Sequence, residues 1–391
     1  MANDTLLSPS GRARLATVQR IGREIVAAAA VDVDRDSRFP SESIDALRSE
    51  GLLAALVPTR YGGGGCTYTD IAAMCRELGQ HCGSTAMVFA MHQIQVACIV
   101  EYGQGEAHFD QFLSEIASRG RLIASATTEA GVGGDVRTSI CAVEQFGDKF
   151  RLEKNATVIS YGDHVDDVLV TARRDADAAA SDQVIVHVQR PLLEMEPRGT
   201  WDAFGMRGTC SIGYLLRATG TIDQIVPTPY SVLSERTMLP VTHILWSSLW
   251  LGLADDAMTK ARTFVRAAAR KSPGVTPLGA RHLAVAQANL DTMRATIEGA
   301  LAEYEAMRAE PNVESTLSFA IRMNQLKLTS STLVVEIIQA AMHVCGIAAY
   351  RNDTPFSLGR QLRDAYSAAL MVHNDRIIEH NASLLCIAKE I

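Results

Sequence analysis

Ser125-Ala-Thr-Thr-Glu-Ala-Gly-Val-Gly-Gly-Asp135 is the stretch of this sequence that says most about its fold. It follows a short apolar run, Leu122-Ile-Ala124, and mixes small hydroxyl residues with three glycines. Glycine lets the backbone approach a bulky ligand closely, and hydroxyl groups supply hydrogen bonds without charge. By itself, the loop leaves a ligand site and an ordinary turn after a strand as alternatives.

A second stretch further along the chain favours the ligand site. It reads Lys154-Asn-Ala-Thr-Val-Ile-Ser-Tyr-Gly-Asp-His-Val-Asp166 and leads into the apolar run Val168-Leu-Val170. Together the two stretches resemble the flavin-facing β domain of the acyl-CoA dehydrogenase family. In that family a Thr-Glu-Pro-x-Ala-Gly-Ser-Asp segment and a Lys-x-x-Ile-Thr-Asn-Gly segment hold the isoalloxazine ring. The resemblance extends from Pro58 to the C-terminus.

Composition and charge exclude several classes of protein. The chain has 391 residues, 47% hydrophobic and 21% charged, which is typical of globular proteins of two or three compact modules. A net charge of −7 gives no basic surface for nucleic acid. The eight cysteines include no C-x-x-C pair, so we expect no metal. Met1 to Thr5 lack a signal-peptide pattern, and Ile244 to Ala254 is too short to span a bilayer. We therefore expect a cytoplasmic protein without a membrane segment.

Helical patterns at both ends of the chain enclose a block of short β-rich runs. Ser41 to Leu47 and Tyr68 to Leu78 show helix-start signals or an apolar helical face. The β-rich runs are separated by turn residues and predict a compact barrel: Leu122–Ala126, Phe150–Leu152, Thr157–Ser160, Val168–Ala172, Gln183–Val188 and Tyr214–Ile222. We predict a mostly α protein of acyl-CoA dehydrogenase-like fold. Its parts are an N-terminal helical domain (1–122), a middle flavin-facing β-barrel (123–228) and a C-terminal four-helix bundle (229–391).

Relatives in this family place a catalytic glutamate shortly after an Arg-Asp-Ala signature, which here is Arg363-Asp-Ala365. That glutamate takes the substrate α-proton, which is weakly acidic and needs a positioned base. Counted from Arg363, the glutamate falls on Val372, and the following Gly-Thr becomes His373-Asn374. Where relatives carry the base on the first long C-terminal helix, the match is Thr242, beside His243. Both positions lack a carboxylate.

The missing carboxylate favours the oxygenase branch of the fold, which lacks the glutamate and carries histidine in this region. There a separate NAD(P)H-dependent reductase supplies reduced flavin, O2 adds at the flavin C4a carbon, and the hydroperoxide hydroxylates an aromatic or a heteroatom. His373 and Asn374 are therefore candidate catalytic residues, because imidazole can assist proton transfer near neutral pH. A helix cap or a subunit contact is the structural alternative for His373. A slip of one residue would instead make His373 a dehydrogenation base.

The resemblance also implies the cofactor contacts. The cofactor is FAD, or FMN as the alternative, and the expected contacts are Thr127, Thr128, Gly133, Gly134 and Ser160. Ser160 is a catalytic candidate as well, and the loop from Thr200 to Ser211 resembles the family's Gly-x-Arg-x-Ser loop near the flavin. In relatives an arginine near the end of the first long C-terminal helix reaches the cofactor of a neighbouring subunit. Arg270 matches it best and Arg266 second, and a solvent-facing helix terminus is the alternative.

The substrate pocket is expected beside an apolar helix, Ala86 to Val100, whose counterpart in relatives lines the acyl cavity. His92 and Gln95 are polar residues in this helix and candidate pocket residues, although such groups usually satisfy one another or the backbone. Val372, Thr242 and His243 complete the predicted pocket.

Three functions fit these observations. The first is a two-component flavin-dependent monooxygenase that uses O2 on a small aromatic, indole-type molecule. The second is an acyl-CoA or acyl-carrier-protein dehydrogenase or oxidase with a non-standard base, and the third is an inactive flavin-binding protein. In each case we expect a homodimer or homotetramer joined through the C-terminal helices, as the resemblance implies.

Overall fold

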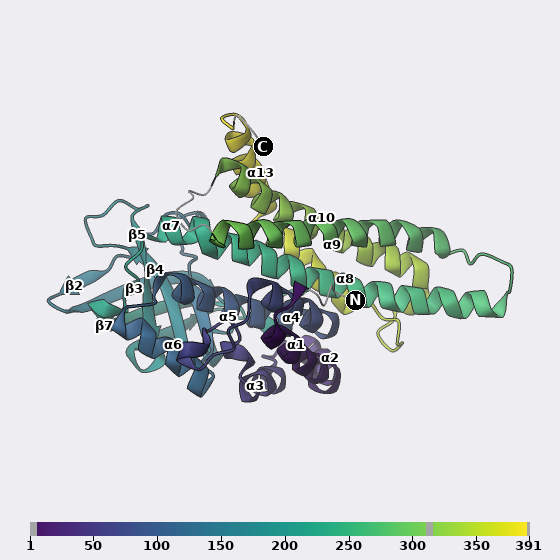
Figure 1. Ribbon diagram of the computed structural model, residues 1–391, viewed down its shortest axis with the longest axis horizontal. Coiled ribbons are helices and arrows are strands. Elements are labelled where there is room, and N and C mark those ends of the chain that lie inside the picture. Colours follow the sequence, from purple (N-terminus) through teal and green to yellow (C-terminus); the bar gives the residue numbers. More distant parts are fainter. Residues whose placement is uncertain (1–5, 310–315, 389–391) are drawn as a thin grey trace.

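The computed structural model describes residues 6–309 and 316–388. Helical regions at both ends of the chain enclose a β domain, as the sequence predicts (Figure 1). Met1–Thr5, on which part of the cytoplasmic expectation depends, lie outside the described residues.

The N-terminal region is a cluster of helices packed beneath the long C-terminal helices (Figure 1). Its α-helices are α1 (Pro9–Ile21), α2 (Ala27–Asp36), α3 (Ser41–Ser49), α4 (Tyr68–His81), α5 (Gly83–Tyr102) and α6 (Ala107–Arg119). Helix α4 begins with a capping box, because the Thr67 hydroxyl accepts from the Asp70 N–H and the Asp70 carboxylate accepts from the Thr67 N–H. Helix α5 is buried on almost every side, as its apolar sequence predicts.

The β domain contains two sheets in place of the single barrel that the sequence predicts. One has the order β1-β4-β5 and the other β2-β3-β7-β6. The strands are β1 (Ile123–Ala126), β2 (Glu144–Phe146), β3 (Lys149–Ile159), β4 (Asp167–Arg173), β5 (Gln183–Gln189), β6 (Leu193–Arg198) and β7 (Ile212–Thr221). Strands β4 and β5 are buried on both faces, whereas β3 alternates between exposed and buried residues. The second sheet therefore keeps one face in solvent, which antiparallel sheets tolerate.

Strand β3 includes two runs that the sequence predicts as separate strands, Phe150–Leu152 and most of Thr157–Ser160. Its pairing with β7 shifts register between Ala156 and Ile159. Such a bulge bends a strand and redirects its side chains. The irregularity falls beside Val158 and Ser160, which belong to the predicted flavin-facing stretch.

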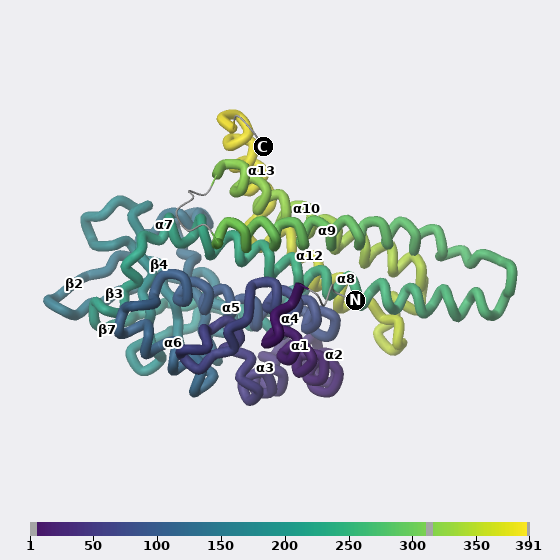
Figure 2. Tube along the Cα trace, in the orientation of Figure 1, coloured from purple at the N-terminus to yellow at the C-terminus, as the bar shows by residue number. Residues whose placement is uncertain are grey.

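The C-terminal region is dominated by three long helices that extend away from the β domain (Figure 2). They are α8 (Leu239–Lys271), α9 (Ala280–Ala309) and α10 (Leu317–Cys345). Shorter α-helices are α7 (Tyr230–Leu233), α11 (Ile347–Tyr350), α12 (Gly359–Tyr366) and α13 (Asn374–Leu385). Helix α12 contacts both α8 and α10, and the chain then turns through residues 367–373 into α13 beside the start of α10.

Two helices, α5 and α10, are long and apolar enough to cross a membrane by length and composition alone. In their most apolar windows, 94% of the residues are buried within the protein for α5 and 44% for α10. A core helix of a folded protein passes the same test, and α5 is such a helix. The stretch Ile244 to Ala254, which was predicted to be too short to span a bilayer, lies in α8 and is not one of these two helices.

Candidate functional site

A cavity of about 550 Å³ lies where α5, the β domain, the start of α8 and the segment from Arg363 to Val372 meet. Its volume is within the range of small-molecule sites. A large part of its wall consists of sulfur-containing and aromatic side chains: Met87, Met91, Met206, Met238, Met371, Tyr161, Trp201, Phe204, Tyr230, Trp246 and Tyr366. Such side chains pack well against flat aromatic groups.

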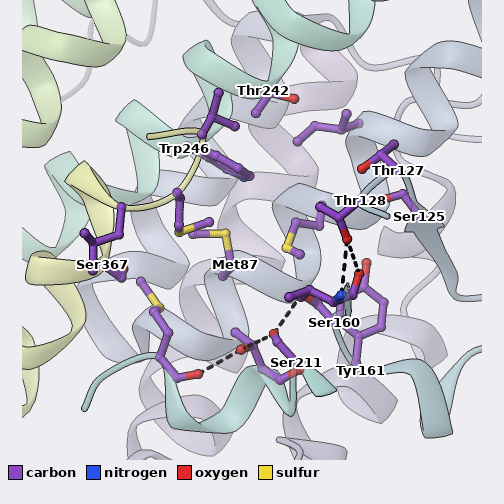
Figure 3. Close-up of a pocket in the computed structure, with 18 of the residues that line it drawn as sticks. Met87, Ser125, Thr127, Thr128, Ser160, Tyr161, Ser211, Thr242, Trp246 and Ser367 are labelled. Atoms are coloured by element: carbon purple, nitrogen blue, oxygen red, sulfur yellow. Dashed lines mark hydrogen bonds between the residues drawn. The ribbon is translucent and has the colours of Figure 1, made fainter. Parts of the chain in front are cut away.

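Hydroxyl groups from the first decisive stretch form another part of the wall. Ser125, Thr127 and Thr128 lie together at the end of β1 (Figure 3). The Thr128 hydroxyl donates to the Val158 carbonyl at 3.1 Å and accepts from the Val158 N–H at 3.2 Å. This pair of bonds fixes the loop against β3 at its bulge.

Ser160 begins a short chain of hydrogen-bonded hydroxyl groups along the cavity wall (Figure 3). Its Oγ lies 2.8 Å from that of Ser211, which lies 2.7 Å from the Thr209 hydroxyl. Thr209 donates to the Met206 carbonyl at 2.8 Å, so its own proton is committed. If each hydroxyl donates to the next, Ser160 presents lone pairs to the cavity and can accept a hydrogen bond from a bound group.

A buried ion pair joins the two decisive stretches beneath the cavity wall. The Lys154 Nζ lies 3.3 Å from Glu129 Oε2, and both side chains are almost fully buried. Glu129 also accepts from the Ser139 hydroxyl and from the N–H groups of Ile140 and Cys141. Burial raises the pKa of Glu129, but the Ser139 bond, the Lys154 charge and the two backbone donors outweigh it and hold the pKa below its ordinary value. The glutamate is therefore a structural anion and does not face the cavity.

The Arg-Asp signature fastens α12 to the rest of the molecule. The Asp364 carboxylate accepts from the Met206 N–H at 2.7 Å, and Arg363 pairs with Asp34 and donates to the Phe204 carbonyl. Burial raises the pKa of Asp364 to about 6, which the charge of Arg360 partly opposes. These contacts fix the segment that follows as a wall of the cavity.

The cavity wall contains a strained residue, Val372, at the position that counting from Arg363 predicts for the family's glutamate. Val372 has a φ of +44°, a conformation that is rare for a β-branched residue. Its carbonyl accepts from Nζ of the buried Lys327, 3.1 Å away on α10, and Lys327 also donates to Asn374 Oδ1 at 2.5 Å. Burial lowers the pKa of Lys327 to about 8. A buried amine thus holds the turn that closes the cavity.

No acidic side chain lines the cavity among the residues that the structure describes. In the same ranges, no three His, Cys, Asp or Glu side chains gather as a metal site. The wall therefore offers hydroxyl groups, an amide and a guanidinium, but no carboxylate to take a proton from carbon.

Six of the predicted site residues line the cavity: Gln95, Thr127, Thr128, Ser160, Thr242 and Val372. The structure places the other seven elsewhere. Gly133 and Gly134 lie in the loop outside the cavity, Arg270 is exposed in the last turn of α8, and Asn374 bonds Lys327 and Ser331.

The three predicted histidines also lie outside the cavity. His92 accepts from the Ile123 N–H at 3.1 Å and donates to the Leu53 carbonyl at 2.8 Å, so it joins α5 to β1. His243 lies within hydrogen-bonding distance of the Met323 carbonyl, at 3.0 Å. Burial lowers the pKa of both to about 4, so neither carries charge near neutral pH. The His373 side chain is 52% exposed, 3.7 Å from Asp375, at the start of α13.

Sequence reasoning missed most of the apolar wall and the Lys327 clamp. Trp201 lies in the loop from Thr200 to Ser211, which resembles the family's loop near the flavin, so this resemblance could have identified it as a wall residue. Trp246 and Tyr366 lie in helical segments whose apolar residues look like ordinary core. The contact between Lys327 and Val372 has no local pattern, because the two residues come together only in the folded chain.

The cavity fits the flavin ring that the fold family implies. Its hydroxyl wall supplies bonding groups, and its apolar side chains suit a flat conjugated system. Thr127, Thr128 and Ser160 are the residues placed to hold such a ring.

Comparisons with known proteins identify the family. The family described as acyl-CoA dehydrogenase, N-terminal domain, matches residues 8–120, and the one described as acyl-CoA dehydrogenase, C-terminal domain, matches residues 235–371. The short-chain acyl-CoA dehydrogenase of Clostridium acetobutylicum is 21% identical over 86% of this chain and 87% of its own. Cyclohex-1-ene-1-carbonyl-CoA dehydrogenase of Syntrophus aciditrophicus is 26% identical over 64% of this chain, and the match spans 61% of that relative.

Solved structures share the fold at low identity. FMN-bound TdsC of Paenibacillus sp. A11-2 has a TM-score of 0.83 at 19% identity, covering 95% of this chain and 96% of its own. Butyryl-CoA dehydrogenase of Megasphaera elsdenii has a TM-score of 0.82 at 17% identity, and the match covers 97% of this chain and 99% of that protein. Since the two domain matches cover more than half of its residues, this chain belongs to the acyl-CoA dehydrogenase family.

Proposed function

We propose that this protein is a flavin-dependent monooxygenase that uses reduced flavin and O2 to hydroxylate a small aromatic molecule. The observation that carries the proposal is the composition of the cavity wall, which among the described residues has no carboxylate. Removal of an α-proton beside a thioester needs a positioned base. Oxygen transfer to an aromatic ring needs instead an apolar chamber that excludes water.

The residues of this chain have separate roles in the proposal. Thr127, Thr128 and Ser160 hold the flavin ring, and reduced flavin, when bound, supplies the electrons that activate O2. Ser160 accepts a hydrogen bond from the bound group, while the methionine and aromatic side chains orient the substrate and exclude water. The turn at Val372, held by Lys327, closes the chamber.

An indole-type substrate is part of the proposal. TdsC, which shares the fold, is described as a dibenzothiophene monooxygenase and has been solved with FMN and indole. The cavity wall of this chain is rich in aromatic and sulfur-containing side chains, which suit a flat aromatic substrate. FAD is the cofactor that the family implies and FMN the one in TdsC, so the proposal covers both. It includes a separate NAD(P)H-dependent flavin reductase and a homodimer or homotetramer.

Product analysis under ¹⁸O2 tests this function. The purified protein is mixed with a generic flavin reductase, NADH, FAD or FMN, and a panel of aromatics that includes indole. We expect a hydroxylated product that carries one ¹⁸O atom and is absent when this protein is omitted. Consumption of NADH without a labelled product from any member of the panel would contradict the proposal.

A second candidate function is dehydrogenation or oxidation of an acyl thioester. The names of the curated relatives favour it, because those given above are acyl-CoA dehydrogenases. The two functions differ in what happens without oxygen or a reductase, since only a dehydrogenase reduces its flavin with the thioester itself. The inactive flavin-binding alternative predicts neither reaction.

A further inference from the structure

Gln95 interrupts an apolar stripe on the face of α5 that lines the cavity. Met87, Met91 and Gln95 are spaced four residues apart, so their side chains lie on one face of the helix, and all three line the cavity. Gln95 is only 4% exposed. A methionine would continue the stripe at this position, so packing alone does not account for an amide here.

The neighbouring polar side chains of α5 bind the backbone of other segments. His92 uses both ring nitrogens, one on Leu53 and one on Ile123. The Gln93 amide nitrogen donates to the Leu52 and Leu53 carbonyls at 3.1 and 3.0 Å. Neither His92 nor Gln93 lines the cavity, so both serve the fold.

The Gln95 amide has no such commitment. Its oxygen is buried and accepts no hydrogen bond from any residue that the structure describes. Among the described residues that line the cavity, only Trp246 also has a buried polar side-chain atom without a partner. The rigid Trp246 ring fixes the direction of its N–H, whereas the last torsion of a glutamine is soft and lets the amide turn. Since buried polar groups are ordinarily hydrogen-bonded, the Gln95 amide is available to a bound molecule.

We propose that Gln95 determines the substrate specificity of the cavity by accepting a hydrogen bond from a ring N–H of the aromatic substrate. This assignment deepens the proposed function and rests on it, because it concerns the substrate of the same site. The substrate class is then a nitrogen heteroaromatic with an N–H, and not its sulfur analogue. A site that bonds a substrate N–H rejects an analogue without it, because its own buried polar group is left unpaired.

The affinities for indole and benzothiophene test this role, because benzothiophene has the same two-ring shape with sulfur in place of the N–H. Dissociation constants are measured by isothermal titration calorimetry on the oxidised, flavin-loaded wild type, Gln95→Met and Met91→Leu. We expect the ratio of the benzothiophene constant to the indole constant to fall about tenfold in Gln95→Met, the effect of one hydrogen bond. Met91→Leu changes the same stripe without removing a hydrogen bond and should keep the wild-type ratio.

Thermal unfolding separates this role from a structural one. Gln95→Met replaces a buried, unpaired amide with an apolar side chain, so the melting temperature of the substrate-free protein should not fall. Gln93→Met is the matched control, because it removes the donor to the Leu52 and Leu53 carbonyls, and its melting temperature should fall. An equal fall in both variants would assign Gln95 to the fold and overturn the proposal.

Three further results would overturn it. They are a wild type that binds neither compound, a ratio that Gln95→Met leaves unchanged, and a loss of flavin affinity in Gln95→Met, which would assign the amide to the cofactor. These measurements need no oxygen or reductase. A preference for indole that depends on Gln95, without any hydroxylated product, would refute the proposed function and leave this assignment intact. A hydroxylated product with an unchanged ratio would refute only this assignment.

Discussion

The Lys154 ammonium lies 3.3 Å from the Glu129 carboxylate, and this buried pair connects the glycine-rich loop to β3. The Ala130 N–H donates to the Asn155 carbonyl at 2.9 Å, directly beside the pair. Two stretches that are separate in sequence thus become one wall of the cavity. Neither charged group of the pair lines the cavity. The pair therefore affects the site indirectly, by fixing the loop and the strand that carry Thr127, Thr128 and Ser160.

Replacing one partner of this pair should destabilise the fold strongly. Lys154→Met leaves the Glu129 carboxylate buried without its cation, which typically costs about 3–5 kcal/mol of unfolding free energy. Arg151→Met, which breaks the exposed pair with Glu144, should cost less than about 1 kcal/mol. Urea denaturation of both variants measures the difference, and equal losses would contradict a special role for the buried pair.

The same pair predicts a loss of stability in acid. The folded state lowers the pKa of Glu129 below its ordinary value of about 4.3, so the unfolded chain takes up this proton first as pH falls. The stabilisation is therefore complete above about pH 4.3 and is lost as pH falls through the folded pKa. Unfolding free energies between neutral pH and pH 3 measure it. Lys154→Met should weaken this dependence, and identical pH profiles for variant and wild type would refute the explanation.

Ser160→Ala should impair catalysis without disturbing the fold. The variant removes the hydroxyl that accepts a hydrogen bond in the cavity, and we expect hydroxylation to slow about tenfold, the effect of one such bond. Ser367→Ala is the matched control, because Ser367 also lines the cavity but donates to the Asp364 carbonyl. Turnover that falls equally in both variants, or in neither, would remove Ser160 from the mechanism.

Lys327→Met should release the strained turn. A backbone conformation such as that of Val372 costs about 1–3 kcal/mol and persists only where its surroundings enforce it. Hydrogen exchange should therefore increase in residues 370–374 of the variant.

In the wild type the pKa of Lys327 rises from about 8 in the folded state to about 10.4 on unfolding. Unfolding free energy should rise with pH in that window, because the unfolded chain binds more protons, and the variant should lose this slope.

A matched variant keeps the Lys327 test specific. Lys149→Met changes an exposed lysine on β3 and should alter neither the exchange nor the pH slope. Unchanged exchange in residues 370–374 of Lys327→Met would show that the lysine does not hold the turn.

Local sequence signals predicted the helical and β regions and six of the residues that line the cavity. Thr127, Thr128 and Ser160 were found because each lies in a stretch whose residue types and spacing resemble a family pattern. Val372 was predicted as a pocket residue by counting from Arg363, and it lines the cavity. These predictions needed only neighbours in the chain.

The positions of the other site residues depend on contacts between parts of the chain that are distant in sequence. His92 looked like a pocket residue because it is polar in an apolar helix, but two distant backbone groups, from Leu53 and Ile123, use both of its ring nitrogens. Arg376, in the first turn of α13, reaches the Gly133 carbonyl only in the folded chain. Such pairings have no trace in local periodicity. The expectation for Arg270 concerns the cofactor of a neighbouring subunit and stays a prediction.

Anaerobic mixing with acyl thioesters tests the central claim, that no base beside the flavin can take a proton from carbon. The flavin-loaded protein is mixed, without oxygen or reductase, with a panel of short-, medium-, branched- and cyclic-chain acyl-CoA compounds, and its visible absorbance is followed. We predict that the oxidised flavin spectrum persists with every member of the panel. Bleaching of the flavin by any one of them would contradict the account.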